Sequence, residues 1–540
     1  MKQLLTAFFL LLSTGYCHAQ WSSNPEENNR IGKPGEDYYE QEVYTNKDGV
    51  SYCVTVFPNG HDENGNSLLS FNLQVVDKDG KCLLPEGGKE ISRERNRSYL
   101  VVDFLGQIDR DGNLLYAIHD GRNADPQQIA LGYTLYKFGP DGEMLWDNPV
   151  DVWNGQTFAG SACYTMTTTD DGGIVLAFTS FPMIESSSEQ SKVRIEKISA
   201  KGESLWQKTI EKEKVPFSYP FVKDAGDNQV ILTFSQGSQQ FLMARMIDFD
   251  GSEVWDKDAV IYQGGFDQTP VWTYLRVNQA PDGGVAVSWR DDRSSEGTFS
   301  NYLSYIQNDG TQGFTDAEGG LKLSYDDNYS RWAPEIYVDK KNRCFYAAYR
   351  QFDQGQQSIQ GIYMQKVGLD GELIWGADGM PVVDMQNDVS LGYVNIQAAD
   401  GDNIVVGWQQ HEEVVYNTQS LIRKFNSDGN PLWQHPLRFT TTKSEKSNLQ
   451  LSPLIDNNYW IASWKDGRDL PGQVQKSCLY MQRINVDGTL GDPSTGIKDI
   501  VPTDDDAPCL YFNLQGQRTH ANGHGLLLKK QGKYVKKSIQ

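Results

Sequence analysis

Aromatic side chains interleaved with arginines are the residues of this sequence whose types best fit a binding site. They gather in the segments 266–274, 289–299, 326–335 and 350–357. An aromatic plane covers the apolar face of a sugar, while guanidinium groups bond its hydroxyls or carboxylates. This chemistry predicts a ligand-binding face built from Trp272, Tyr274, Arg293, Tyr329, Arg331, Trp332 and Arg350.

Each of these residues also has a purely structural interpretation. Asp291 with Arg293, and Asp466 with Arg468, have the spacing of ion pairs that fix loops between structural units. The large aromatic residues fit burial in a core as well as contact with a ligand. At this point both interpretations remain open.

Catalytic chemistry has less support in the sequence. The six histidines after residue 19 form no HExxH motif, and no G-x-S-x-G sequence is present. His520 and His524 have a metal-ligand spacing, but they lie in an expected coil, where such a spacing arises by chance. Tyr274 or Tyr329 beside Arg331 has the residue types of a lyase base and its cation, although nothing singles them out. We therefore expect no cofactor and no metal, and a role in binding; the alternative is a polysaccharide lyase or glycoside hydrolase that uses the same face.

The elements that must position these residues repeat along the chain. A short polar turn with glycine recurs eight times, with intervals of 62, 60, 49, 59, 61, 58 and 59 residues between the glycines. These glycines are Gly80, Gly142, Gly202, Gly251, Gly310, Gly371, Gly429 and Gly488. Such a regular spacing indicates an array of one repeated structural unit.

The segment 362–375, IYMQKVGLDGELIW, shows the repeated unit most clearly. Two alternating runs flank Asp370-Gly371, which predicts a β-hairpin with positive φ at both turn residues and a second strand that carries Trp375. Tryptophan recurs at this position in five copies, as Trp146, Trp206, Trp255, Trp375 and Trp433. A recurring indole favours packing against the neighbouring unit over contact with a ligand.

A polar turn followed by a short apolar run precedes each hairpin, again eight times. Each unit then holds four short antiparallel strands, and no segment has the period of a helix. Because such a sheet cannot bury both faces alone, radial stacking around an axis is expected. The sequence predicts an all-β fold, a β-propeller of eight four-stranded blades over residues 38–501; a seven-bladed ring is the alternative.

Two further features are interpreted as structural. Asp-x-Asp-Gly sequences at 77–80, 109–112 and 248–251 lack the distal glutamate of a calcium loop, so they are expected to be turns. The six cysteines after residue 19 are scattered, and we expect buried free thiols; Cys53 with Cys82 is the one pairing to consider.

The ends of the chain predict export. Residues 1–19 have the charged start, apolar run and small-residue end of a signal peptide, which is followed by an N-terminal extension at 20–37. The apolar run is too short to span a bilayer, so a soluble protein is expected, secreted or at the outer-membrane surface. A net charge of −22 argues against nucleic acid as a partner. We expect a monomer that binds an extracellular glycan or protein.

The Gly-x-x-x-Trp spacing resembles the tryptophan-docking repeat of quinoprotein-like propellers, many of which have eight blades. Trp289-x-Asp291-x-Arg293 and Trp464-x-Asp466-x-Arg468 are similar to repeats of secreted Bacteroidetes proteins. After a linker at 502–510, residues 511–540 form an expected small C-terminal β segment. It resembles the terminal segment that directs exported Bacteroidetes proteins through the type IX secretion system.

Overall fold

The structure is a computed structural model. It describes residues 21–492, except for 34–39, 66, 96–103, 119–132, 153–157, 182–189, 239–240, 264–274, 294–296, 315–318, 356, 414–416 and 470–476, together with 509–512, 518–519, 526–531 and 534–539. The predicted signal peptide, Trp272, Tyr274 and most of the predicted linker lie outside the described residues.

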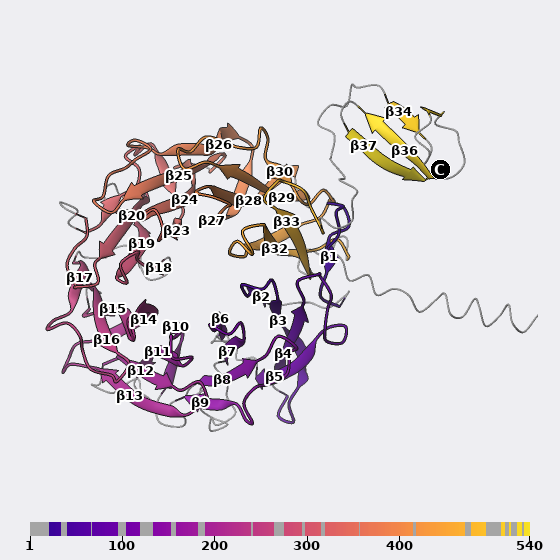
Figure 1. The fold of residues 1–540 in the computed structure, drawn as a ribbon. Coiled ribbons are helices and arrows are strands. Elements are labelled where there is room, and N and C mark those ends of the chain that lie inside the picture. Colours follow the sequence, from indigo (N-terminus) through magenta and orange to yellow (C-terminus); the bar gives the residue numbers. More distant parts are fainter. Residues whose placement is uncertain are drawn as a thin grey trace, which may run out of the picture.

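Eight antiparallel sheets stand around a central axis, and each contributes one blade (Figure 1). The first four blades are built from β2 (Glu40–Thr45), β3 (Ser51–His61), β4 (Ser67–Val76) and β5 (Lys89–Arg95); β6 (Phe104–Ile108), β7 (Leu114–Ile118), β8 (Tyr133–Phe138) and β9 (Val150–Val152); β10 (Phe158–Thr168), β11 (Ile174–Phe181), β12 (Lys192–Ile198) and β13 (Ser204–Ile210); and β14 (Phe217–Gly226), β15 (Gln229–Gln236), β16 (Phe241–Asp248) and β17 (Ala259–Tyr262).

The second half of the ring follows the same order. Blades five to eight are built from β18 (Arg276–Gln279), β19 (Val285–Asp291), β20 (Ser300–Ile306) and β21 (Leu321–Lys322); β22 (Tyr329–Arg331), β23 (Glu335–Asp339), β24 (Cys344–Asp353), β25 (Ile359–Gly368) and β26 (Met380–Asn387); β27 (Ser390–Ala398), β28 (Ile404–Glu413), β29 (Asn417–Phe425) and β30 (Leu437–Arg438); and β31 (Lys446–Leu451), β32 (Tyr459–Asp466), β33 (Cys478–Asn485) and β1 (Asn29–Arg30). The prediction of eight four-stranded blades is confirmed.

The ring closes through its N-terminal residues. In the eighth blade, the outermost strand is β1, in which Asn29 pairs with Met481 and Arg30 with Tyr480 of β33. The last blade is thus assembled from both ends of the propeller. This arrangement places part of the predicted N-terminal extension inside the propeller.

The hairpin turns differ from the prediction in one respect. Gly371 has a φ of 88°, but Asp370 is not among the residues with positive φ. The amide of Gly371 donates to the carbonyl of Gly368, and the amide of Gly368 donates to the carbonyl of Glu372. The left-handed Gly371 is therefore the last residue of a four-residue turn over 368–371. The prediction of two positive φ angles was wrong, because this longer turn needs only a final glycine.

In blade six the fourth strand does not begin directly at the turn. After Gly371 a single bridge joins Val367 to Leu373, and β26 starts only at Met380. In blade six, therefore, the predicted strand around Trp375 is a bend between turn and strand. The bend frees the indole from the sheet and lets it reach the neighbouring blade.

The predicted role of the tryptophans is confirmed. The indole Nε1–H of Trp206 donates to the carbonyl of Phe249 in the next blade at 2.8 Å. A Cβ added to Gly251 would lie 3.3 Å from the same indole. The indole therefore rests on the turn of the next blade, where only a glycine leaves room for it.

This docking contact occurs at every junction of the ring. The pairs are Leu84 with Gly142, Trp146 with Gly202, Trp206 with Gly251, Trp255 with Gly310, Phe314 with Gly371, Trp375 with Gly429, Trp433 with Gly488 and Trp21 with Gly80. Trp21, which is 2% exposed, donates from Nε1 to the carbonyl of Lys78 at 2.8 Å. Trp21 therefore supplies the docking residue that the hairpin of the eighth blade lacks.

The expected turns, and the expected absence of a Cys53–Cys82 disulfide, are found in the structure. Asp77 Oδ1 accepts the backbone N–H groups of Asp79 and Lys81, which makes the Asp-x-Asp-Gly sequence a turn. Cys53 and Cys82 carry thiols and are not joined by a disulfide. Among the described residues, no group of three or more His, Cys, Asp or Glu side chains is placed to hold a metal ion. No described helix is long and apolar enough to cross a membrane.

A separate four-stranded sheet follows near the C-terminus. It consists of β34 (Cys509–Phe512), β35 (Arg518–Thr519), β36 (Leu526–Gln531) and β37 (Tyr534–Ile539) in the order β35-β34-β36-β37 (Figure 1). These strands overlap the predicted segment at 511–540, but β34 begins at Cys509, inside the predicted linker at 502–510.

Candidate functional site

The innermost strands of the ring carry bulges at equivalent places. In blade four, Tyr219 and Pro220 lie between the pairs Ser218–Ser235 and Phe221–Thr233, so two residues oppose one. The same interruption occurs at 393–394 in β27 and at 448–449 in β31. In blade six it is larger, because residues 332–334 separate β22 from β23 and both strands pair with β24. The fold thus repeats one irregular backbone feature beside its axis.

These bulges hold residues in a costly backbone conformation. Tyr219, Tyr393 and Asn448 have φ values of 53°, 49° and 54°. Left-handed backbone is unfavourable for a bulky side chain and recurs at functional sites. A bulge also re-aims the side chain that it carries. Tyr393 is 48% exposed and Trp332, in the bulge of blade six, is 42% exposed. The bulges therefore present large aromatic side chains to solvent from strands that line the ring.

Two arginines flank Trp332. The guanidinium of Arg290 lies 4.1 Å from the centroid of the indole ring, and that of Arg350 lies 5.2 Å from it. Burial, together with the positive charge of Arg290, lowers the pKa of Arg350. The two guanidinium groups thus repel each other beside an exposed aromatic plane, which makes the place receptive to an anion.

Backbone bonds fix this cluster in place. The amide of Trp332 donates to the carbonyl of Arg350 at 2.9 Å. Arg350 in turn donates from Nη1 to the carbonyl of Leu391 at 2.6 Å, near the start of β27. Leu391 lies two residues before Tyr393, so the cluster joins the exposed aromatic residues of blades six and seven.

Arg331 and Tyr329 precede Trp332 on the same segment, but they differ in burial. The Arg331 side chain is fully buried, and its Nη2 donates to Ser324 Oγ at 2.7 Å and to the carbonyl of Asp326. Tyr329 pairs with Asp353 at the start of β22 and is partly exposed. Arg331 thus holds the loop before Trp332, while Tyr329 remains accessible at its edge.

Arg293 is bound within the wall of the ring. Its Nη2 lies 2.7 Å from Asp291 Oδ2, and its guanidinium lies against the rings of Tyr262 and Tyr302, at 4.2 and 3.8 Å. Asp291 also accepts the indole N–H of Trp289 at 2.9 Å. Of the two interpretations of Arg293, the structure shows the ion pair with Asp291 that fixes the fold.

The second such pair, Asp466–Arg468, is similar. Arg468 Nη2 lies 2.6 Å from Asp466 Oδ2, and that carboxylate accepts the indole N–H of Trp464. Salt-bridge and hydrogen-bond partners lower the pKa of Asp466 despite its burial. Both Trp-x-Asp-x-Arg sequences thus form closed polar networks inside the fold.

The structure adds three site residues that the sequence analysis did not identify. Arg290 precedes Asp291 at the end of β19, and Tyr219 and Tyr393 lie in the bulges. No motif marks the bulges, because the innermost strands are the least regular part of each repeat. The Tyr-Pro sequence at 219–220 was the available signal, because proline disfavours regular strand pairing.

A second polar group lies on an innermost strand of the first blade. Tyr44 donates from its hydroxyl to the Glu42 carboxylate and accepts the amide N–H of Gly106 at 2.8 Å. Burial raises the pKa of Glu42 to about 7. Glu42 therefore changes its protonation state near neutral pH, whereas burial and the Glu42 charge raise the pKa of Tyr44, which stays protonated. Among the described contacts this pair shares none with the Trp332 cluster.

Comparisons with known proteins give fold-level similarities only. The sequence matches no protein-family model and no curated protein. Among solved structures, the chain is similar to an ulvan lyase bound to -[GlcA(1-4)Rha3S]-, with a TM-score of 0.43 and 10% identity over 90% of this chain and all of that one. It is also similar to the polysaccharide lyase Uly1, with a TM-score of 0.41 and 12% identity over 88% of this chain and 94% of that one.

A third similarity is to an α-L-arabinofuranosidase of Fusarium graminearum. Its TM-score is 0.36 at 14% identity, over 73% of this chain and 95% of that one. All three similarities have TM-scores below 0.5 and identities of 14% or less. At these identities and scores they carry no argument about what this chain does.

Proposed function

We propose that the protein binds an acidic polysaccharide at the inner-strand bulges of blades six and seven. The observation that carries this proposal is the exposed indole of Trp332 beside Arg290 and Arg350. An indole face packs against the C–H groups of a pyranose ring, and guanidinium groups pair with carboxylate or sulfate oxygens. Neutral sugars would leave the repulsion between the two arginines in place, so an acidic one is preferred.

The neighbouring bulges extend the binding surface. Tyr393 offers a second exposed ring in the adjacent blade, and Asn448 offers an amide in the blade after that. Since Arg350 is joined to the backbone of Leu391 by a hydrogen bond, the first two positions are held at a fixed separation. A chain of several sugar units is therefore favoured over a single one.

Cleavage of the same polysaccharide by β-elimination is the second candidate. The observation that favours it is the bond from Arg350 to Leu391, which holds a cation two residues from the exposed Tyr393. Elimination needs a cation that neutralises the uronate carboxylate and a base that removes the proton at C5. The electron pair of the C5–H bond then forms the C4–C5 double bond, the C4–O bond breaks, and the leaving oxygen takes up a proton from the protonated base or from water. Arg350 would supply the first role and Tyr393 the second.

The place of action is proposed to be outside the cytoplasm. The signal-peptide pattern at 1–19 and the basic terminal segment at 511–540 support export, as in the secreted Bacteroidetes proteins that the repeats resemble. Expression of the full-length chain with fractionation of cells and medium tests this. Retention of the unprocessed chain in the cytoplasm would contradict it.

Titration with polygalacturonate tests the main proposal. We expect saturable binding by calorimetry, and Trp332→Ala should weaken it about tenfold, or ~1.4 kcal/mol. Tyr325→Ala is the matched control, because Tyr325 is 54% exposed but lies outside the innermost strands. Equal binding by all three proteins, or no binding, would refute the site.

Ultraviolet absorbance of the unsaturated product separates the two candidates. If Tyr393 is the base, Tyr393→Phe should abolish product formation while binding persists. Binding of polygalacturonate by the wild-type protein without any new absorbance would leave binding alone as the function for that polymer.

A further inference from the structure

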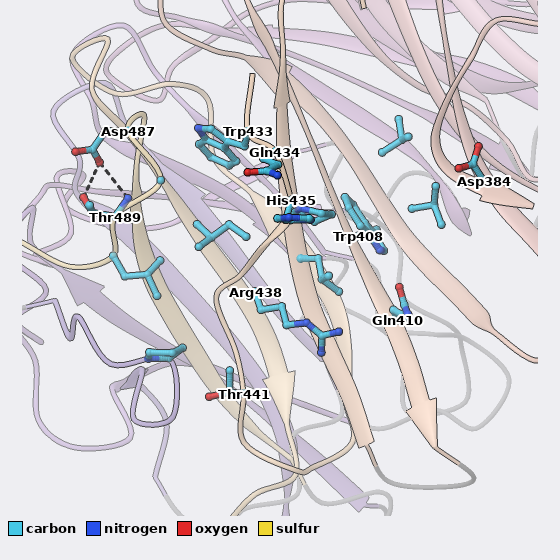
Figure 2. A pocket seen from close by; sticks show the side chains of 18 of the residues that line it. Asp384, Trp408, Gln410, Trp433, Gln434, His435, Arg438, Thr441, Asp487 and Thr489 are labelled. Carbon is cyan, nitrogen blue, oxygen red and sulfur yellow. Dashed lines mark hydrogen bonds between the residues drawn. The ribbon is translucent and has the colours of Figure 1, made fainter. Parts of the chain in front are cut away.

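A pocket of about 840 Å³ opens between the outer parts of blades six, seven and eight. Figure 2 shows Trp408 and Gln410 of β28 together with His435, which precedes β30, and Arg438, which lies in β30. Leu421 of β29 and Val383 of β26 also line it. It is formed by residues other than those of the Trp332 cluster.

In blades five and eight, aromatic side chains fill the position equivalent to this pocket. In blade five, Trp289 is stacked on Tyr302 of the paired strand, with ring centroids 6.0 Å apart, and packs on Tyr262 of the preceding blade at 5.8 Å. In blade eight, Trp464 packs in the same way against Tyr480 and against Phe439 of the preceding blade. Each tryptophan is thus enclosed by two aromatic rings.

Blade seven keeps the tryptophan and lacks these partners. Trp408 pairs across the sheet with Leu421, where the other two blades have tyrosine. Val383 pairs with Ile362 at the position that Tyr262 occupies opposite Leu242. The Asp-x-Arg that should follow the tryptophan is replaced by Gln410 and Glu412. Beside this pocket, other side chains thus replace the two rings, the carboxylate and the guanidinium of blades five and eight.

One buried donor is left without an acceptor by these replacements. Trp408 is 1% exposed, and within the described structure its Nε1–H has no hydrogen-bond partner. In blades five and eight the equivalent N–H donates to Asp291 or Asp466 at 2.9 Å. A buried donor without a partner is unfavourable, so an oxygen atom brought by a ligand would be stabilised there.

We propose that this pocket binds a small six-membered-ring compound that carries a carboxylate. The ring takes the place of the missing aromatic side chains against Trp408, and a carboxylate oxygen takes the place of the missing aspartate. Arg438, whose guanidinium pairs with Glu412 and remains about half exposed, supplies a cation in the lining of the pocket. A pocket of this size suits a small ligand, and its lining combines apolar side chains with polar ones, which include Asp384 and Asp487.

Two probes distinguish the two classes of ligand that carry a six-membered ring and a carboxylate. Glucuronate presents a saturated sugar ring, and 4-hydroxybenzoate presents a planar aromatic one. Titration of the full-length protein with each, by calorimetry, should give saturable binding for at least one of them. Binding of 4-hydroxybenzoate alone indicates an aromatic acid, and binding of glucuronate alone indicates a sugar acid.

Two variants test the location. Leu421→Tyr restores the ring of blades five and eight and should abolish binding. Trp408→Phe keeps a ring but removes the N–H group, and should weaken binding about tenfold. Trp332→Ala, in the polysaccharide site, should leave this binding unchanged, so that failure here is distinguishable from failure of the proposed function. No saturable binding of either probe, or unchanged binding in both pocket variants, would overturn the proposal.

Discussion

Replacing Trp21 with alanine should open the propeller at its closure. Trp21 is the docking residue between the eighth and first blades, and its indole lies 3.0 Å from a Cβ added to Gly80. The same segment supplies β1, which pairs with β33. A single side chain near the N-terminus is therefore expected to act on the junction of blades that are far apart in sequence.

The magnitude follows from burial and one hydrogen bond. Trp21 is 2% exposed, and truncation of a buried tryptophan to alanine lowers the free energy of unfolding by about 3–5 kcal/mol. Trp21→Phe keeps most of the ring contact but loses the bond from Nε1 to the carbonyl of Lys78, so about 1–2 kcal/mol is expected. Trp146→Ala, at an internal junction with an 8% exposed indole, is the matched control.

Urea unfolding followed by circular dichroism measures these differences. We expect Trp21→Ala and Trp146→Ala to destabilise the protein by similar amounts, with Trp21→Phe between them and the wild type. Trp21→Ala should also increase hydrogen exchange in β1 and β33 before the rest of the ring. A loss below about 1 kcal/mol for Trp21→Ala, with a normal loss for Trp146→Ala, would refute the closure.

Two further predictions concern the scaffold. Burial raises the pKa of Glu42 from 4.5 to about 7, so the folded protein binds more protons than the unfolded one between these pH values. The free energy of unfolding should therefore fall by about 3 kcal/mol as the pH rises through this range. Glu42→Gln should remove this pH dependence in urea unfolding, and an unchanged dependence would contradict the prediction. Gly310→Ala places a Cβ 3.0 Å from Trp255 at a φ of +84°. It should lower the melting temperature more than Gly226→Ala, because Gly226 has a similar φ of +77° but no atom within 4 Å of an added Cβ. Equal shifts in melting temperature would show that docking plays no part.

The sequence predicted the ring because its repeated contacts are local. Each turn glycine and the tryptophan four residues later lie in one hairpin, so their even spacing was enough to indicate blades. Leu84 and Phe314 occupy the same docking position in two weaker copies. Trp21 was missed because it belongs to no repeat hairpin: it precedes the first repeat, whereas the hairpin whose docking residue it replaces, with its turn at Gly488, is the last one.

The candidate site was harder to predict, for two physical reasons. Bulges in the innermost strands change which way a side chain is directed, and Tyr393 gave no sign of its left-handed backbone. Arginines that look alike in the sequence also have different roles in the fold. Arg331 and Arg293 bond to neighbouring side chains of the scaffold, whereas Arg350 lies beside Trp332. The pocket around Trp408 could have been found by aligning the Trp-x-Asp-x-Arg positions, where blade seven has glutamine and glutamate instead.

A crystal structure of the protein with a bound oligogalacturonate is the most direct test of the proposed function. We expect a sugar ring stacked on the Trp332 indole, with its carboxylate within hydrogen-bond distance of Arg290 or Arg350. Sugar bound elsewhere on the ring, with the Trp332 indole left uncovered, would contradict it.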